Sequence, residues 1–155
     1  MKYILIAFLL TILMLGCRTQ QSINVEAEKA AIKTVLDNYI VSVENEDMDL
    51  YGDCVAHDSA MVNFGAMGGP IVGWDALVAV MKAQNEALSD TKIVATNTEI
   101  HITPWGKTAW ATSLWNLSAI MGENPLNLDL RCTWVLEKRM DKWIIVHFHK
   151  SAAMG

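Results

Sequence analysis

The sequence has few basic residues and lacks two common ion-binding loops. Its 155 residues include 12 lysines and arginines against 17 aspartates and glutamates, a net charge of −5 at pH 7. This balance disfavours nucleic acids and anionic lipid surfaces, because both attract proteins through clustered positive charge. The glycine-rich stretch 65–69 lacks the Lys-Ser/Thr that completes a phosphate-binding loop, and the acidic stretch 44–49 lacks the glycine of a calcium loop. We expect no cofactor, no bound metal and no nucleic-acid partner.

The amino-terminal residues have the composition of a cleaved secretion signal. Lys2 is followed by residues 4–16, an uncharged and mainly apolar run. A membrane-spanning helix needs roughly 20 apolar residues, so this run is too short to span a bilayer but suits the core of a signal peptide. The rest of the sequence contains no apolar run that would span a membrane. We therefore expect the chain to be exported.

The apolar run ends in Met14-Leu15-Gly16-Cys17, which resembles the bacterial lipobox. In that motif the cysteine takes a lipid and the signal is cut before it. The resemblance implies a signal peptide at 1–16, lipidation of Cys17, and a polar tether at 17–24. It also implies a place in the cell envelope, with the protein lipid-anchored to a bacterial membrane and its domain in the periplasm or at the surface. An ordinary signal with a coincidental cysteine is the alternative.

The chain from residue 25 to residue 155 is long enough for one domain with a core and too short for two. Apolar residues recur at three- and four-residue spacing between Glu26 and Glu44, which predicts an amphipathic helix. A short helix at 46–51, a short strand at 60–64 and a further helix capped by Asp75 should follow.

After Asp90 the apolar period changes to two, and turn residues at 103–106, 122–125 and 140–141 divide four long segments. This pattern predicts an antiparallel meander. Alternation groups Val94, Thr96, Thr98, Ile100 and Ile102 in the first segment, Leu128, Leu130, Cys132, Trp134 and Leu136 in the third, and Ile144, Val146, Phe148 and Lys150 in the last. Helices followed by an antiparallel sheet indicate an α+β domain, with the helices covering the apolar sheet face.

Two stretches resemble the SnoaL-like branch of the nuclear transport factor 2 (NTF2-like) superfamily. Residues 45–81 have its acidic turn, its short strand after an aspartate, and Gly73 opening the next helix. Residues 143–151, Trp-Ile-Ile-Val-His-Phe-His-Lys-Ser, are similar to the last strand of the association domain of calmodulin-dependent kinases. The resemblance implies a cone in which a strongly bent antiparallel sheet wraps the first helix and a pocket opens at the wide end. Such folds carry many functions.

The resemblance also implies which residues line the pocket. Lys150 stands where the kinase domain has an arginine that reaches into its pocket, and Trp134 stands at the position of a second pocket arginine. Together with strand alternation, this predicts a ligand site formed by Tyr39, Trp115, Trp134 and Phe148, with Lys150 near its mouth. Mostly apolar walls with one or two polar groups suit a small hydrophobic or aromatic molecule.

His147 and His149 are two residues apart on a predicted strand, so their side chains project in the same direction. Such a pair can hold a metal ion or act as a base and its orienting partner. The kinase association domain keeps both histidines without being an enzyme, which favours a structural or interface role over catalysis or metal binding.

Cys54 and Cys132 could form a disulfide in an oxidising compartment. The alternation of Cys132 with apolar neighbours is typical of a small buried residue and favours two free thiols instead. Both possibilities remain open at this point.

The leading hypothesis is a membrane-anchored domain that binds a small hydrophobic or aromatic molecule. The alternative is a cofactor-free isomerase, cyclase or dehydratase of the SnoaL-like kind, in which burial of an acid or base moves its pKa toward neutrality. The predicted apolar face holds no aspartate or glutamate, which favours binding.

A third possibility is a homodimeric assembly module, because an exposed sheet face carrying Trp143, Ile145 and His147 would be apolar enough to be covered by a second copy. We expect a homodimer.

Overall fold

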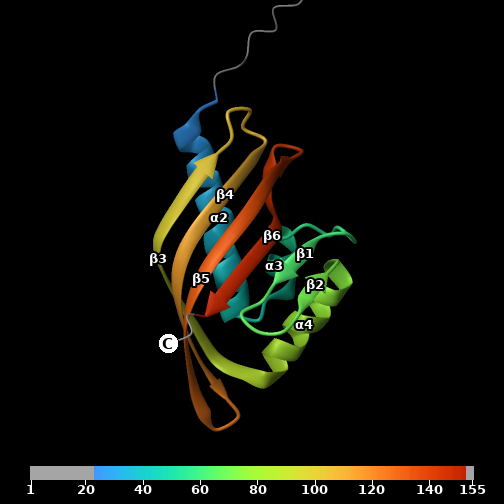
Figure 1. The fold of residues 1–155 in the computed structure, drawn as a ribbon, viewed down its shortest axis with the longest axis vertical. Helices are drawn as coiled ribbons and strands as arrows, with labels where there is room; N and C mark the ends of the chain where they lie inside the picture. Colours follow the sequence, from blue (N-terminus) through green and yellow to red (C-terminus); the bar gives the residue numbers. More distant parts are fainter. Residues whose placement is uncertain (1–22, 153–155) are drawn as a thin grey trace, which may run out of the picture.

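The computed structural model describes residues 23–152, which form three helices and one six-stranded sheet (Figure 1). In chain order the elements are α2 (Val25–Glu44), α3 (Met48–Cys54), β1 (Val62–Phe64), β2 (Pro70–Val72), α4 (Trp74–Ala87), β3 (Leu88–Ile102), β4 (Thr108–Met121), β5 (Asn124–Arg139) and β6 (Lys142–Ala152). The predicted α+β class is confirmed. The expected signal peptide, Cys17 and most of the tether lie outside the described residues. No helix within residues 23–152 is long and apolar enough to cross a bilayer.

The strand order is β2-β1-β6-β5-β4-β3. The four long strands form the predicted antiparallel meander, and β1 joins it by pairing in parallel with β6. Figure 1 shows α2 running along one face of the curved long strands, whereas α4 lies beside the short β1–β2 hairpin at the lower end of the sheet. The strand β2 falls in a segment where glycines predict only a loop. This hairpin and α4 together enlarge one end of the molecule.

Helix α2 forms for the reasons visible in the sequence. Its boundaries match the predicted 26–44 within one residue, and the Asn24 side chain caps it by accepting a hydrogen bond from the Ala27 N–H. Glutamates in the first turn interact favourably with the helix dipole. The residues that it buries against the sheet recur at three- and four-residue spacing, namely Ile32, Leu36, Tyr39, Ser42 and Val43.

The prediction that Asp75 caps α4 is wrong. The helix begins at Trp74, and its N-cap is Gly73, which has φ 82° and makes no side-chain capping bond. A Cβ at this position would lie 2.8 Å from the carbonyl oxygen of Ser59, so backbone approach excludes a side chain there. Asp75 lies in the first turn of the helix instead.

A β-bulge in β6 overturns the predicted alternation of that strand. Val135 pairs with His147 while Leu136 pairs with Ile145, so Val146 is an extra residue on β6. The two buried residues Trp143 and Ile145 therefore point into the core, on the same side as Phe148. The prediction that Trp143 and Ile145 form an exposed apolar face is wrong, because an inserted residue exchanges the two faces of a strand.

A second irregularity interrupts β3. The register shifts between Thr96 and Glu99, and Asn97 between them has φ 51°. Before this point Thr91 and Ile93 are buried and Val94 is exposed, so the single face predicted from Val94 to Ile102 does not exist. Strand β5 has no bulge in its pairing with β4 and shows the predicted burial of Leu130, Cys132, Trp134 and Leu136.

Candidate functional site

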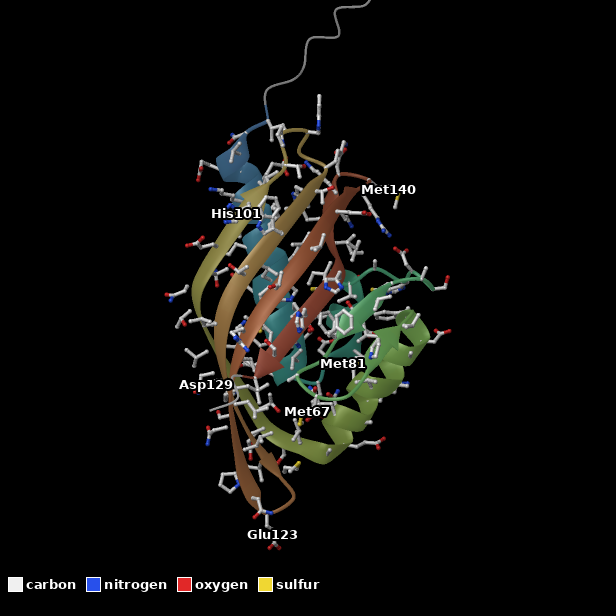
Figure 2. The ribbon with its side chains drawn as sticks, viewed as in Figure 1. Met67, Met81, His101, Glu123, Asp129 and Met140 are labelled. Carbon is white, nitrogen blue, oxygen red and sulfur yellow. The ribbon has the colours of Figure 1, made fainter. Side chains whose placement is uncertain are left out.

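A cavity of about 300 Å³ lies where α4, the loop after β1 and the lower ends of the long strands meet. In Figure 2, Met67 on the loop and Met81 on α4 mark this region, between α4 and the sheet. The lining residues are Val43, Gly65, Ala66, Met67, Ile71, Leu77, Val80, Met81, Gln84, Ala87, Leu88, Leu117, Met121, Leu126, Leu128, Leu130, Phe148 and Lys150. The volume is at the lower end of the range of small-molecule sites.

The walls of this cavity are almost entirely apolar. Among its lining side chains, Gln84 and Lys150 carry the polar groups, and none is an aspartate, glutamate or histidine. Leu77 is fully buried and Met81 nearly so, so α4 contributes a continuous apolar wall. A ligand here would gain free energy mainly by removing apolar surface from water.

Lys150 lies at the junction between the cavity and the aromatic core. Its Nζ donates a hydrogen bond to the hydroxyl oxygen of Tyr39 over 3.0 Å. The same nitrogen lies 5.0 Å from the ring centroid of Tyr39 and 4.9 Å from those of Trp115 and Phe148. None of the ion pairs found between residues 23 and 152 includes Lys150. Burial without an anion lowers the pKa of the Lys150 ammonium.

Several polar groups in the surrounding core have no hydrogen-bond partner among the described residues. They include the Tyr51 hydroxyl and the indole N–H groups of Trp115 and Trp134. Burial also raises the pKa of Tyr39 and of Tyr51 above their usual range, so both phenols are neutral at physiological pH. Among residues 23–152, the core around Lys150 is therefore polar in places, and its two phenols are uncharged.

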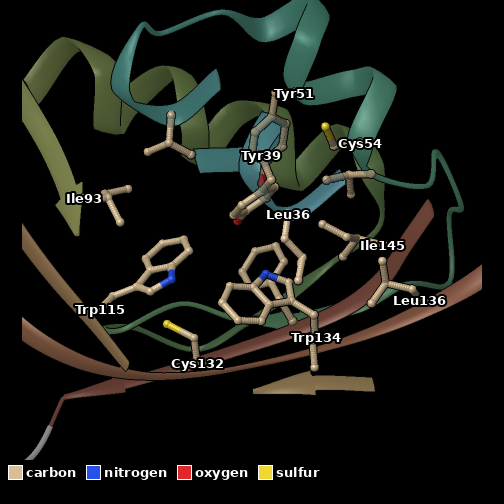
Figure 3. Close-up of a cluster of buried hydrophobic side chains, with 14 of the residues drawn as sticks. Leu36, Tyr39, Tyr51, Cys54, Ile93, Trp115, Cys132, Trp134, Leu136 and Ile145 are labelled. Atoms are coloured by element: carbon tan, nitrogen blue, oxygen red, sulfur yellow. The ribbon is translucent and has the colours of Figure 1, made fainter. Parts of the chain in front are cut away.

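The structure brings the five predicted ligand residues together but does not place all of them in the cavity. The ring centroid of Tyr39 lies within 6.5 Å of those of Trp115, Trp134 and Phe148, and Figure 3 shows Tyr39 above the two tryptophans. Phe148 and Lys150 line the cavity, whereas Tyr39, Trp115 and Trp134 are packed behind them and are at most 2% exposed.

The sequence prediction did not include the cavity walls that come from α4, the loop 65–67 and the end of the β4–β5 hairpin. The apolar stripe Leu77, Val80 and Met81 was visible as one face of a helix. Nothing in that stripe indicates which sheet strands it opposes, because helical spacing identifies a buried face but not its partner.

His147 and His149 lie beside β1, on the part of β6 that follows the bulge. The Nδ1 atom of His147 is 2.6 Å from the carbonyl oxygen of Val62, and both imidazoles contact the ring of Phe64 edge to face. Neither lines the cavity. Within residues 23–152 no group of three or more His, Cys, Asp or Glu side chains is placed to hold a metal ion.

Cys54 and Cys132 are free, buried thiols. Figure 3 shows Cys54 in the helical layer and Cys132 in the sheet layer, next to Trp115 and Trp134. Burial raises the pKa of each thiol to about 11, so neither is a ready nucleophile.

Two carboxylates with lowered pKa values lie outside the cavity. Asp58 accepts two hydrogen bonds from Arg139, and Glu28 accepts one from Lys138 and one from the indole of Trp143. These bonds lower the pKa of Asp58 and of Glu28, so both stay ionised at neutral pH. Such groups act as structural ion pairs and are poor proton donors.

Comparison with protein families identifies the domain. A model of the SnoaL-like domain matches residues 32–155, so the chain belongs to the SnoaL-like domain family. No functionally curated protein matches the sequence.

Solved structures share its NTF2-like fold. A nuclear transport factor 2 (NTF2-like) superfamily protein from Salmonella enterica serovar Typhimurium is similar with a TM-score of 0.77 and 19% identity, covering 84% of this chain and 94% of that one. The CaMKII hub of S. rosetta is similar with a TM-score of 0.67 and 24% identity, covering 80% and 95%. A ketosteroid isomerase-like protein from Erwinia carotovora atroseptica has a TM-score of 0.68 and 15% identity, covering 81% and 96%. At these identities the likeness concerns the fold.

Proposed function

We propose that this protein binds a small, largely apolar molecule in the cavity beside α4, with the polar end of the molecule directed toward Lys150. The observation that supports this most is the composition of the cavity, in which apolar walls surround one amine at the border of the core. Pockets of this kind gain affinity from apolar burial and orientation from the few polar groups.

A cofactor-free isomerase, cyclase or dehydratase is the second candidate. The fold shared with a ketosteroid isomerase-like protein supports it. Such chemistry needs an acid or base beside the bound substrate, and the described lining residues include no carboxylate or imidazole. Lys150 would be the one basic group among them in reach of a substrate, which makes binding the better supported function.

Native mass spectrometry of the purified protein tests the binding function. We expect a retained small molecule in the wild-type protein and its loss in Leu128→Trp, because the larger side chain fills the cavity from the β5 wall. Asn127→Trp is the matched control, since Asn127 is exposed on the opposite face of the same strand. Equal retention in all three proteins would place the molecule elsewhere and contradict this site.

We also propose that the protein is a lipoprotein of the cell envelope, lipidated at Cys17 and anchored to a bacterial membrane. The support is the lipobox resemblance of residues 14–17. Metabolic labelling with a fatty acid in the host cell should label the wild-type protein and not Cys17→Ala. Labelling of both would show that the lipid is attached elsewhere.

A homodimer is the third part of the proposal. The apolar residues exposed on the outer sheet face are Val94, Trp110 and Leu114 of β3 and β4, and His101 stacks on Trp110. These residues are now the candidates for the dimer interface in place of Trp143 and Ile145, which are buried in the core. A CaMKII hub shares the fold, which is compatible with assembly through this domain.

A further inference from the structure

Among the described residues that line the cavity, Lys150 alone carries a titratable amine, and no aspartate, glutamate or histidine is among the groups that act on its pKa. The titratable groups that act on it from the neighbouring elements are Tyr51 of α3 and Cys132 of β5, and Tyr39 of α2 accepts its hydrogen bond. The pKa of each of these three acids is raised by burial. The coulombic effect of Tyr51 and Cys132 favours the ammonium form, but it is smaller than the desolvation that opposes this form.

Burial shifts this amine toward its neutral form, because removal from water penalises the ammonium. The three aromatic rings around its nitrogen interact favourably with an ammonium. Desolvation is nevertheless the largest influence on its pKa, and the neutral form has the free electron pair that makes lysine a nucleophile.

We propose that Lys150 forms an imine with the carbonyl group of an apolar aldehyde or ketone held in the cavity. This rests on the proposed binding function and names the chemical class of the ligand. An uncharged carbonyl group suits walls that hold no ion-pairing partner, whereas a carboxylate would have to be desolvated together with the ammonium.

The chemistry needs no oxidant or reductant. The nitrogen lone pair attacks the carbonyl carbon, a C–N bond forms, and the π electron pair moves to oxygen, which takes a proton from nitrogen. The resulting carbinolamine loses its hydroxyl group and the second nitrogen-bound proton as water, and the C=N bond forms. The hydroxyl of Tyr39, 3.0 Å from the Lys150 nitrogen, is placed to relay these protons.

Reductive trapping tests the proposal. The purified protein is incubated with octanal and sodium cyanoborohydride near pH 7, because this reagent reduces the protonated imine and spares the free aldehyde, and peptide mapping locates any added octyl group. We expect octyl-Lys150 to form at least about tenfold faster than adducts of exposed lysines, because the cavity holds the aldehyde beside an amine whose neutral form is favoured by burial. Lys150→Met and Lys150→Arg should lose the fast adduct. Lys92→Met, which removes an exposed lysine of β3, should keep it.

Binding without chemistry is measured in parallel with 1-octanol and octanoate, followed by tryptophan fluorescence. Binding of 1-octanol with uniform slow labelling of all lysines would overturn the imine and leave the binding function standing. Binding of octanoate alone would overturn it in favour of a carboxylate ligand. Failure of all three compounds to bind or react would count against both the imine and the proposed binding function. Because the wild-type peptide map decides between sites, the test does not depend on the folding of any variant.

Discussion

The Lys150 amine lies at the core without a carboxylate partner among the described residues. This should make the free energy of unfolding depend on pH. Its pKa is lowered in the folded protein, whereas in the unfolded chain it keeps the ordinary value of 10.5. Between these two values the unfolded chain binds more protons than the folded one, so the free energy of unfolding rises with pH. Below the folded pKa this gain is absent.

We therefore expect the stability of the wild-type protein relative to Lys150→Met to increase from pH 7 toward pH 10. Urea unfolding at a series of pH values measures the difference. The phenols and thiols that also titrate in this range are present in both proteins and cancel. A difference that stays constant with pH would mean that Lys150 keeps its ordinary pKa.

Gly68, Gly69 and Gly73 allow two backbone requirements to be tested separately. One is a positive φ, and the other is the lack of space for a Cβ. Gly69 has an ordinary φ and open space around it, Gly68 has φ 88° with open space, and Gly73 has φ 82° with the Ser59 carbonyl oxygen 2.8 Å from where a Cβ would lie. We expect Gly69→Ala to be nearly neutral, Gly68→Ala to cost about 1 kcal/mol, and Gly73→Ala to cost at least about twice as much. Denaturant midpoints measure the series. Equal costs at Gly68 and Gly73 would show that the backbone at Ser59 moves aside.

At the scale of elements, the bulge in β6 decides which residues build the core. Ile145 is fully buried and also pairs with Val55, whereas Ile144 is half-buried. We expect Ile145→Ala to cost about 2–5 kcal/mol of stability and Ile144→Ala less than half of that. Uninterrupted alternation would give the reverse order, because it groups Ile144 with Phe148. Equilibrium unfolding of the two variants distinguishes these cases.

The elements differ in how far the sequence predicts them. The long helix α2 and the alternating strands β4 and β5 follow from local periodicity, because each buries one face along much of its length. The bulges at Val146 and near Asn97 have no such signature. The first lies between the pairing of β6 with Val55 and its pairing with β1, so partners distant in sequence determine it. The hairpin β1–β2 was partly missed for the same reason.

At the scale of the molecule, the outer sheet face should form the dimer interface. We expect sedimentation to give a dimer at micromolar concentration and Leu114→Asp to give a monomer, because a charge would be buried in the interface. Met140→Asp is the control, since Met140 is 96% exposed and lies at the tip of the β5–β6 hairpin, away from His101 (Figure 2). A monomeric wild-type protein would remove the dimer from the proposal.

In the candidate site, too, local strand alternation predicts some positions, whereas others depend on packing between segments far apart in the chain. Lys150 and Phe148 could be placed at a pocket from the last strand, since alternation beyond the bulge puts both on the inner face. Tyr39, Trp115 and Trp134 lie against one another, yet they fill the core behind the cavity instead of lining it. Whether a large aromatic side chain lines a cavity or fills the core depends on how closely the opposite layer approaches, and helix α3 brings Tyr51 against Tyr39.

The α+β class, the order of the main elements and the amphipathic faces of the helices and of β5 follow from the amino-acid sequence alone. These features depend on periodicity within single segments, where burial of one face repeats along the chain. The faces of β3 and β6, the cap of α4 and the position of the cavity emerge only when the chain is folded. Each of these depends on strand register or on close approach between segments far apart in the chain, and no local pattern carries that information.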